Sequence, residues 1–299
     1  MTASNESPFG ELAGVELVST HGMPSVRVRT QAATGLVFLQ GAHVAEWVPA
    51  GQAPVIWMSE KAVYRAGKAL RGGIPICFPW FGNHPEHKAY PAHGFTRTKE
   101  LKYLGARATA DGGAELELML EDDAATFAFF PHAFEARLRV AFGKTLELAF
   151  TVMNRGSDSF SFEEALHSYF RVADVREASI VGLSGATYHD KVRAMAEFIE
   201  TAPELRLTGE TDRVYESHAA CTIVDPPGKR SLRVEKTHSH TTVVWNPWTE
   251  RAAEMADLGA DAWSSMVCVE SANVADARVT LAPGERHTLG VAVSVASAG

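Results

Sequence analysis

Phe134-Glu-Ala-Arg-Leu-Arg-Val-Ala-Phe142 and Thr145-Leu-Glu-Leu-Ala-Phe-Thr-Val152 are neighbouring runs in which apolar side chains recur at every second position. A period of two places those side chains on one face of a β-strand. Only Gly143 and Lys144 separate the runs, which is the length and chemistry of a tight hairpin turn. The two runs therefore predict an antiparallel hairpin with one buried face.

The same alternation extends over much of the chain, at residues 115–121 and 289–295. Helical signals are short: one covers residues 249–258 and ends at Gly259, and a weaker one covers residues 190–199. No low-complexity linker divides the chain. We predict one all-β domain, a large antiparallel sandwich over residues 13–299, after a flexible arm over residues 1–12. Further strands are expected at 25–30, 34–39, 53–58, 99–105, 159–172, 230–236, 241–246 and 264–270.

Composition narrows the class of protein. The 299 residues are 46% hydrophobic and carry a formal net charge of −8, which argues against binding to nucleic acid or to anionic membranes. No apolar run is long enough to span a bilayer, and the N-terminus lacks the pattern of a signal peptide. The three cysteines have no CxxC spacing, which fits a reducing compartment. We expect a cytoplasmic monomer.

The least regular stretch runs from Arg71 to Arg97 and contains Arg71-Gly-Gly-Ile-Pro-Ile-Cys-Phe-Pro-Trp-Phe-Gly82. Pro75 and Pro79 prevent regular secondary structure, whereas the glycines permit close backbone approach. Its aromatic side chains make it too apolar for a solvated loop. It is either a rigid buried crossover or the floor of a small-molecule pocket with both arginines aimed into it.

Three residues are candidates for chemistry, each with a structural alternative. His167 lies on a predicted strand and is either a catalytic acid/base group or a structural histidine. Glu270 follows the apolar run Trp263-Ser-Ser-Met-Val-Cys-Val, so it must be paired, hydrogen-bonded or functional. Asp212 lies in a polar segment that simple turn chemistry also explains. A regular strand would place the following residues on one face: Ser161, Glu163, Ala165, His167 and Tyr169.

Metal and cofactor sites are not indicated. The groups His84, His87, His93 and His238, His240 lack a nearby carboxylate in a recognised ligand frame. No GxSxG motif, P-loop or dinucleotide fingerprint is present. We therefore expect no metal and no cofactor.

Six segments, taken together and in order, resemble the aldose 1-epimerase superfamily, specifically its hexose-6-phosphate mutarotase (glucose-6-phosphate 1-epimerase-like) branch. The segments span about residues 70–275 and are Arg71–Gly82, His93–Arg97, Leu166–Phe170, Thr211–Tyr215, Val244–Trp248 and Val269–Asn273. The resemblance implies a galactose-mutarotase-like supersandwich. It also implies cofactor-free interconversion of the α and β anomers of a sugar.

The resemblance assigns roles to individual residues. His167 matches the general acid that protonates the ring oxygen, and Glu270 matches the general base that takes the proton of the anomeric hydroxyl. The substrate-binding positions that match are Arg71, Arg97, Asp212 and His93. Ala92 departs from the family pattern, in which glutamine precedes the His-Gly pair, and so lacks that side-chain hydrogen bond to the substrate.

The leading hypothesis is an isomerase for a hexose 6-phosphate, glucose 6-phosphate above all, since arginine binds phosphate through charge-assisted, often bidentate hydrogen bonds. One alternative is a mutarotase for unphosphorylated aldoses, in which the arginines form structural ion pairs. Another is a non-catalytic carbohydrate-binding protein on the same fold. A pure binder has no need of an acid/base pair, which speaks against the last alternative.

Overall fold

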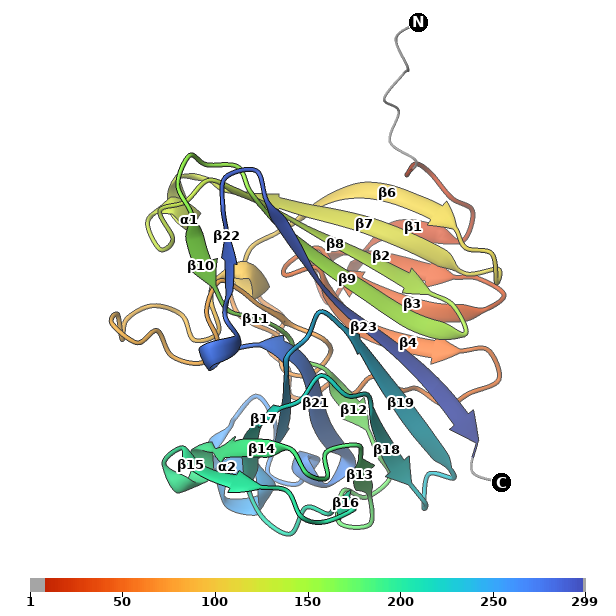
Figure 1. The fold of residues 1–299 in the computed structure, drawn as a ribbon. Coiled ribbons are helices and arrows are strands. Elements are labelled where there is room, and N and C mark those ends of the chain that lie inside the picture. The colour runs from red at the N-terminus through yellow and green to blue at the C-terminus, as the bar shows by residue number, and fades with distance from the viewer. Residues whose placement is uncertain (1–8, 298–299) are drawn as a thin grey trace, which may run out of the picture.

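A computed structural model describes residues 9–297 of the chain. Strands dominate, and every pair of strands is antiparallel within this range (Figure 1). The predicted hairpin is confirmed: β8 (Phe134–Phe142) and β9 (Thr145–Asn154) pair along their full length. Their alternate side chains are buried, as the period of two requires.

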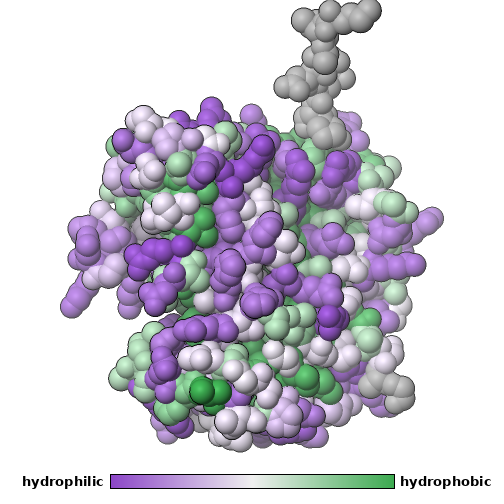
Figure 2. All heavy atoms as spheres, viewed as in Figure 1, coloured by the Kyte–Doolittle hydropathy of each residue, from purple (hydrophilic) through white to green (hydrophobic). Residues whose placement is uncertain are grey.

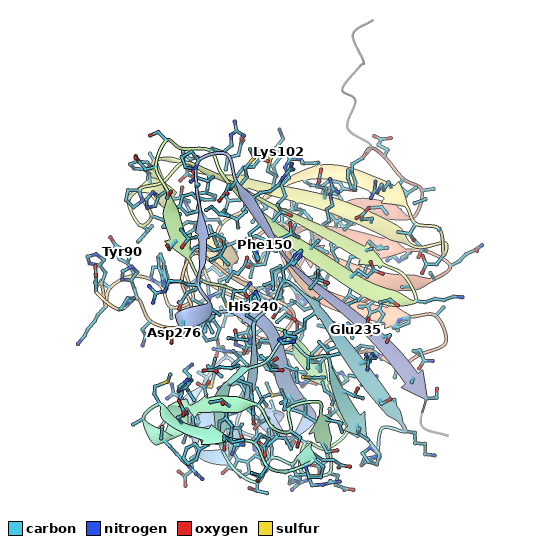
Figure 3. All side chains as sticks on the ribbon, viewed as in Figure 1. Tyr90, Lys102, Phe150, Glu235, His240 and Asp276 are labelled. Carbon is cyan, nitrogen blue, oxygen red and sulfur yellow. The ribbon has the colours of Figure 1, made fainter. Side chains whose placement is uncertain are left out.

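β8 and β9 belong to a nine-stranded sheet. Its other strands, in order from one edge to the other around this pair, are β16 (Glu204–Leu205), β13 (Ser179–Val181), β18 (Cys221–Asp225), β19 (Arg230–Thr237), β23 (Arg286–Ser297), then β7 (Ala114–Glu121) and β6 (Lys102–Ala108). One face of this sheet carries the main core, in which Phe150 lies between the layers (Figure 3).

Two further sheets contribute buried side chains to that core. The N-terminal sheet has the order β1 (Val15–Thr20), β2 (Met23–Arg29), β3 (Ala33–Phe38) and β4 (His43–Pro49). The eight-stranded sheet has the order β15 (Ala196–Ile199), β14 (Thr187–Asp190), β17 (Thr211–Glu216), β20 (Thr241–Asn246), β21 (Met266–Asn273), β11 (Glu164–Leu166) and β5 (Ile76–Cys77), with β12 (Tyr169–Arg171) also paired to β21. β10 (Phe160–Phe162) and β22 (Val279–Leu281) form a separate ribbon.

The helices are short. They are α1 (Ala124–Phe127), α2 (Trp248–Glu254) and the 3-10 turns η1 (Thr96–Thr98), η2 (Lys191–Arg193), η3 (Ala262–Ser265) and η4 (Ala275–Ala277). The expected helix at 249–258 is therefore present but ends earlier. The expected helical turn or two at 190–199 is confirmed only in part: the 3-10 turn η2 is present, but β15 follows it and pairs with β14.

Two strand predictions also need correction. Residues 53–58 form only isolated bridges, because Val55 bonds to β4 and Trp57 bonds to β12, so the segment crosses between sheets. The predicted strand 159–172 is broken into β10, β11 and β12. The breaks fall where the backbone N–H groups of Glu163 and His167 donate to Pro79 and Pro75 instead of to a strand. Tyr169 therefore starts a new strand, rather than continuing the face of Ser161.

The predicted arm, residues 1–12, lies largely outside the described residues. Within the described part, Phe9 is buried and Gly10 bridges to Ala106 of β6. Residues 9–12 are thus held against the nine-stranded sheet.

The stretch from Arg71 to Arg97 joins the core to the surface. Phe78 is fully buried and contacts five other phenylalanine rings with centroid separations of 5.2–6.2 Å. Gly94 has a φ of 74°, and a Cβ there would lie 2.0 Å from the Phe78 carbonyl oxygen, so only glycine fits. Beyond this anchor the chain projects outward, and Tyr90 lies on the projecting loop (Figure 3).

Candidate active site

A cavity of about 490 Å³ opens on the face of the eight-stranded sheet that points away from the main core. In Figure 2 the surface is notched on the side where the loop after β5 projects above β14 and β15. The volume is that of a small-molecule site. Its lining comprises Arg71, Phe81, His93, His167, Tyr169, Lys191, Glu210, Asp212, Trp245, Arg251, Met255 and Glu270.

His167 and Glu270 meet in this cavity. The Nε2 atom of His167 lies 3.3 Å from Oε1 of Glu270, and the two residues are 7% and 1% exposed. β21 places Glu270 opposite Val243 of β20, in the middle of the sheet. The break between β11 and β12 turns His167 toward Glu270, with its N–H bonded to the Pro75 carbonyl oxygen at 3.0 Å. The Arg71–Arg97 stretch thus positions the histidine.

Neither side chain has the hydrogen bonds that its burial would ordinarily demand. Both carboxylate oxygens of Glu270 and the Nδ1 atom of His167 are buried without a hydrogen-bond partner. Burial, and then the charge of Asp212, raises the pKa of Glu270 well above its ordinary value. Burial, with the charges of Arg97 and Arg71, lowers the pKa of His167 well below its ordinary value. A buried carboxylate with unused oxygens is typical of a functional site, where perturbed pKa values gather.

Aromatic rings shape the wall around the pair. Tyr169 stacks on His167 with centroids 4.8 Å apart and an interplanar angle of 12°. Trp245 meets both rings edge-on, at 6.0 and 5.9 Å. These contacts fix the plane of the imidazole and leave an apolar surface beside it.

Arg71 reaches the cavity with its guanidinium held from behind. Its Nε and Nη2 atoms each donate to a different oxygen of Asp257 at 3.3 Å, and Nη1 donates to the Tyr169 hydroxyl at 3.2 Å. An arginine has five N–H donors, so two are left for a ligand. Sequence reasoning missed Asp257, because 186 positions separate it from Arg71 and no local pattern marks it.

Arg97 and His93 lie on the same side of the site, but at different depths. His93 lines the cavity, its ring 5.7 Å from that of His167, and its Nδ1 lies 3.4 Å from the Cys77 sulfur. Burial, followed by the charge of Arg97, lowers the pKa of His93. Arg97 is not among the lining residues. Its Nη2 donates to the carbonyl oxygen of Ala92 at 2.6 Å, and its Nε is buried without a partner.

Asp212 lies across the sheet, opposite Trp245 in the β17–β20 ladder. Burial raises its pKa, whereas Lys191 opposes that effect. The Lys191 ammonium lies 3.0 Å from Oδ2 of Asp212. The sequence did not identify Lys191 as a site residue. The structure therefore gathers His167, Glu270, Arg71, Asp212 and His93 around one cavity and places Arg97 behind its wall.

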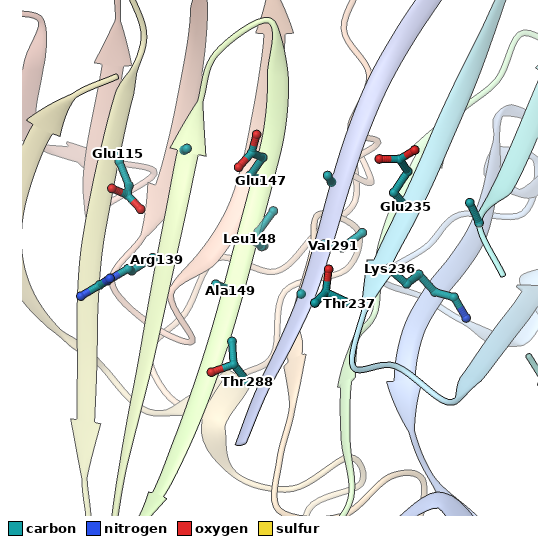
Figure 4. A pocket seen from close by; sticks show the side chains of 14 residues that line it. Glu115, Arg139, Glu147, Leu148, Ala149, Glu235, Lys236, Thr237, Thr288 and Val291 are labelled. Atoms are coloured by element: carbon teal, nitrogen blue, oxygen red, sulfur yellow. The ribbon is translucent and has the colours of Figure 1, made fainter. Parts of the chain in front are cut away.

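A second hollow of about 510 Å³ lies on the outer face of the nine-stranded sheet (Figure 4). Charged side chains stand at its margins over a floor of alanine and glycine. Arg139 there bonds to Glu117 at 2.8 Å. No histidine or cysteine lines it, so it holds no histidine–carboxylate pair like that of His167 and Glu270.

No group of three or more histidine, cysteine, aspartate or glutamate side chains among residues 9–297 is arranged to hold a metal ion. No helix in the same range is long and apolar enough to cross a membrane.

The structure is thus an antiparallel supersandwich in which one sheet carries the buried His167 and Glu270 side chains beside a cavity. Comparison with known proteins identifies the class to which it belongs. The family model described as aldose 1-epimerase matches residues 25–294. The chain belongs to the aldose 1-epimerase family, and the predicted resemblance and fold class are confirmed.

The names of similar curated proteins are consistent with this family. A Salmonella typhimurium protein, provisionally named a glucose-6-phosphate 1-epimerase, is 36% identical over 78% of this chain and 77% of its own. A protein of the same provisional name from Cenchrus ciliaris is 33% identical over 96% and 88%. The crystal structure of a provisionally assigned mutarotase from Salmonella typhimurium superposes with a TM-score of 0.89 at 30% identity, over 97% of each chain.

Proposed function

We propose that this protein is an isomerase that interconverts the α and β anomers of a hexose 6-phosphate, with glucose 6-phosphate as its principal substrate. The observation that carries the proposal is the buried carboxylate of Glu270, which has no hydrogen-bond partner and lies 3.3 Å from the imidazole of His167. Membership of the aldose 1-epimerase family and the names of the relatives support the reaction and the substrate.

In the proposed reaction Glu270 takes the proton of the anomeric hydroxyl while His167 gives a proton to the ring oxygen. The C1–O5 bond breaks and the C1 carbonyl forms, which yields the open-chain aldehyde. Rotation about C1–C2 and closure with the roles reversed give the other anomer. Each positioned acid or base typically contributes about 10²- to 10⁴-fold in rate.

The protonation states of His167 and Glu270 give a reason why a phosphorylated sugar suits this site better than a neutral one. Burial, together with the charges of Arg97, Arg71 and Lys191, helps to keep His167 neutral, and a neutral imidazole is a poor acid. A phosphate dianion opposes those three cations and so favours the imidazolium form. Because His167 and Glu270 lie so close, they titrate as a pair, and the substrate charge shifts the proton toward histidine.

Arg71 is the proposed direct phosphate ligand, since its two remaining N–H donors are held in place by Asp257 and Tyr169. Arg97 adds positive charge from behind the wall, where no carboxylate pairs with it among residues 9–297. His93 and Asp212 are proposed to bind sugar hydroxyls. The cations are needed because a protein of net charge −8 otherwise repels the substrate.

All three cysteines are buried free thiols, which supports residence in the reducing cytoplasm.

The test measures exchange between the anomers of glucose 6-phosphate by NMR, with a β-specific coupled dehydrogenase as a second assay. We expect catalytic amounts of protein to accelerate exchange and Glu270→Gln to abolish most of the gain. If a folded Glu270→Gln variant accelerates exchange as well as the wild type does, Glu270 is not the general base. Equal losses with glucose and glucose 6-phosphate in Arg97→Ala would point to the free-aldose alternative, and binding without acceleration to the non-catalytic one.

A further inference from the structure

Lys191 is held in the cavity by a turn that allows it little freedom. It begins η2, and the Asp190 side chain caps this turn by accepting from the backbone N–H groups of Val192 and Arg193 at 3.0 and 3.3 Å. Asp190 is 4% exposed and lies 3.6 Å from Arg213 of β17. The turn closes with Ala194 and Met195, both of positive φ. Several interactions therefore fix where Lys191 emerges from β14.

The ammonium group of Lys191 bridges two walls of the cavity. On one side it is 3.0 Å from Oδ2 of Asp212, and on the other it lies over the Phe81 ring at 5.2 Å from the centroid. A cation over an aromatic face is attracted by the negative charge density of the ring. Lys191 is thus retained beside Asp212 from both sides.

The position matters because two carboxylates share this part of the cavity. The charge of Asp212 disfavours ionisation of Glu270, and that of Lys191 favours it. Two unpaired carboxylates in one site resist double ionisation. The titratable and charged groups around Glu270 are His167, Tyr169, Asp212, Lys191, Arg97, Cys77 and Cys268.

We propose that Lys191 is a positioning residue of the acid/base pair: by pairing with Asp212 it offsets the negative charge that Glu270 would otherwise face, and so favours the ionised form of the base. The proposal rests on the proposed function for the role of Glu270, but its physical content, the ionisation of Glu270, is measurable without substrate. Lys191 itself does not transfer a proton.

The direct test is carboxyl ¹³C NMR of protein labelled at glutamate, with Glu270→Gln used to assign the resonance. We expect the Glu270 titration midpoint in Lys191→Met to move up by about one pH unit, as for loss of a neighbouring opposite charge. Lys191→Arg keeps the charge and should leave the midpoint near that of the wild type. Arg193→Met is the matched control, because it removes a cation from the same turn. The side chain of Arg193 is 62% exposed and lines no part of the cavity. An unchanged midpoint in Lys191→Met overturns the proposal.

Kinetics separate this role from simple substrate binding. Lys191 lowers the pKa values of both Glu270 and His167, so both limbs of the pH–rate profile should move to higher pH in Lys191→Met. We expect a loss of about tenfold in kcat at pH 6.5 that shrinks at pH 8.5, and recovery in Lys191→Arg. A rise in KM with both limbs in place contradicts the inference. If the wild type shows no anomer exchange, the proposed function fails, and the NMR titration still decides the role of Lys191.

Discussion

Replacing Glu270 by glutamine should lower activity and raise stability at the same time. The change removes one charge and keeps the size of a side chain that is 1% exposed and has both oxygens unpartnered. Leaving a buried polar group unsatisfied costs about 1–3 kcal/mol, and more for a charged group. We therefore expect the variant to gain about 1–3 kcal/mol in unfolding free energy at pH 8, while it loses about 10²- to 10⁴-fold in anomer exchange.

The stability gained by Glu270→Gln, relative to the wild type, should increase as pH rises. The pKa of Glu270 is raised in the folded protein, so the native state binds a proton that the unfolded chain has released. Stability therefore falls as pH rises from about 4.5, the ordinary glutamate value, up to the raised folded value. The glutamine variant lacks this loss, so its advantage should vanish below about pH 4.5.

Urea unfolding at pH 4 to 9 measures the difference directly. Glu197→Gln, on an exposed position of β15, is the matched control and should change stability by less than about 0.5 kcal/mol at every pH. A glutamine variant that is less stable than the wild type at pH 8, or a difference that does not vary with pH, would refute the reasoning.

Three further outcomes are expected. Arg71→Ala should lower kcat/KM for glucose 6-phosphate by about 10- to 100-fold, as for loss of charged hydrogen bonds, and change exchange of free glucose far less; equal losses argue against phosphate binding. Asp257→Asn weakens the support of Arg71 and should raise KM several-fold with little change in kcat, checked by steady-state kinetics. Phe78→Ala should destabilise the protein by about 3–5 kcal/mol in urea, because the ring is fully buried among five others; a loss below about 1 kcal/mol would contradict its role as an anchor.

Sequence patterns predicted those parts of the fold that local chemistry determines. The β8–β9 hairpin was recognisable because its two-residue turn and its alternation lie within twenty residues. The segment 159–172 was less tractable, because its breaks depend on carbonyl groups of Pro75 and Pro79 some ninety residues earlier in the chain. Alternation alone cannot show where a strand exchanges partners.

The site residues also fall into two groups, those that the sequence predicted and those that it did not. His167, Glu270, Arg71 and Asp212 were predicted from motifs, and they converge on one cavity. Asp257 and Lys191 were not, since each acquires meaning only from a partner that the fold brings close. The local pattern around Lys191 predicted a short helical turn, which η2 forms, and gave no sign of the cavity.

Two-dimensional exchange NMR of glucose 6-phosphate, at pH 7.5 with a catalytic amount of wild-type protein, tests the central claim most directly. The account predicts α–β cross-peaks that grow with protein concentration, exceed those obtained with glucose, and disappear in Glu270→Gln. An exchange rate equal to that of buffer alone would contradict it.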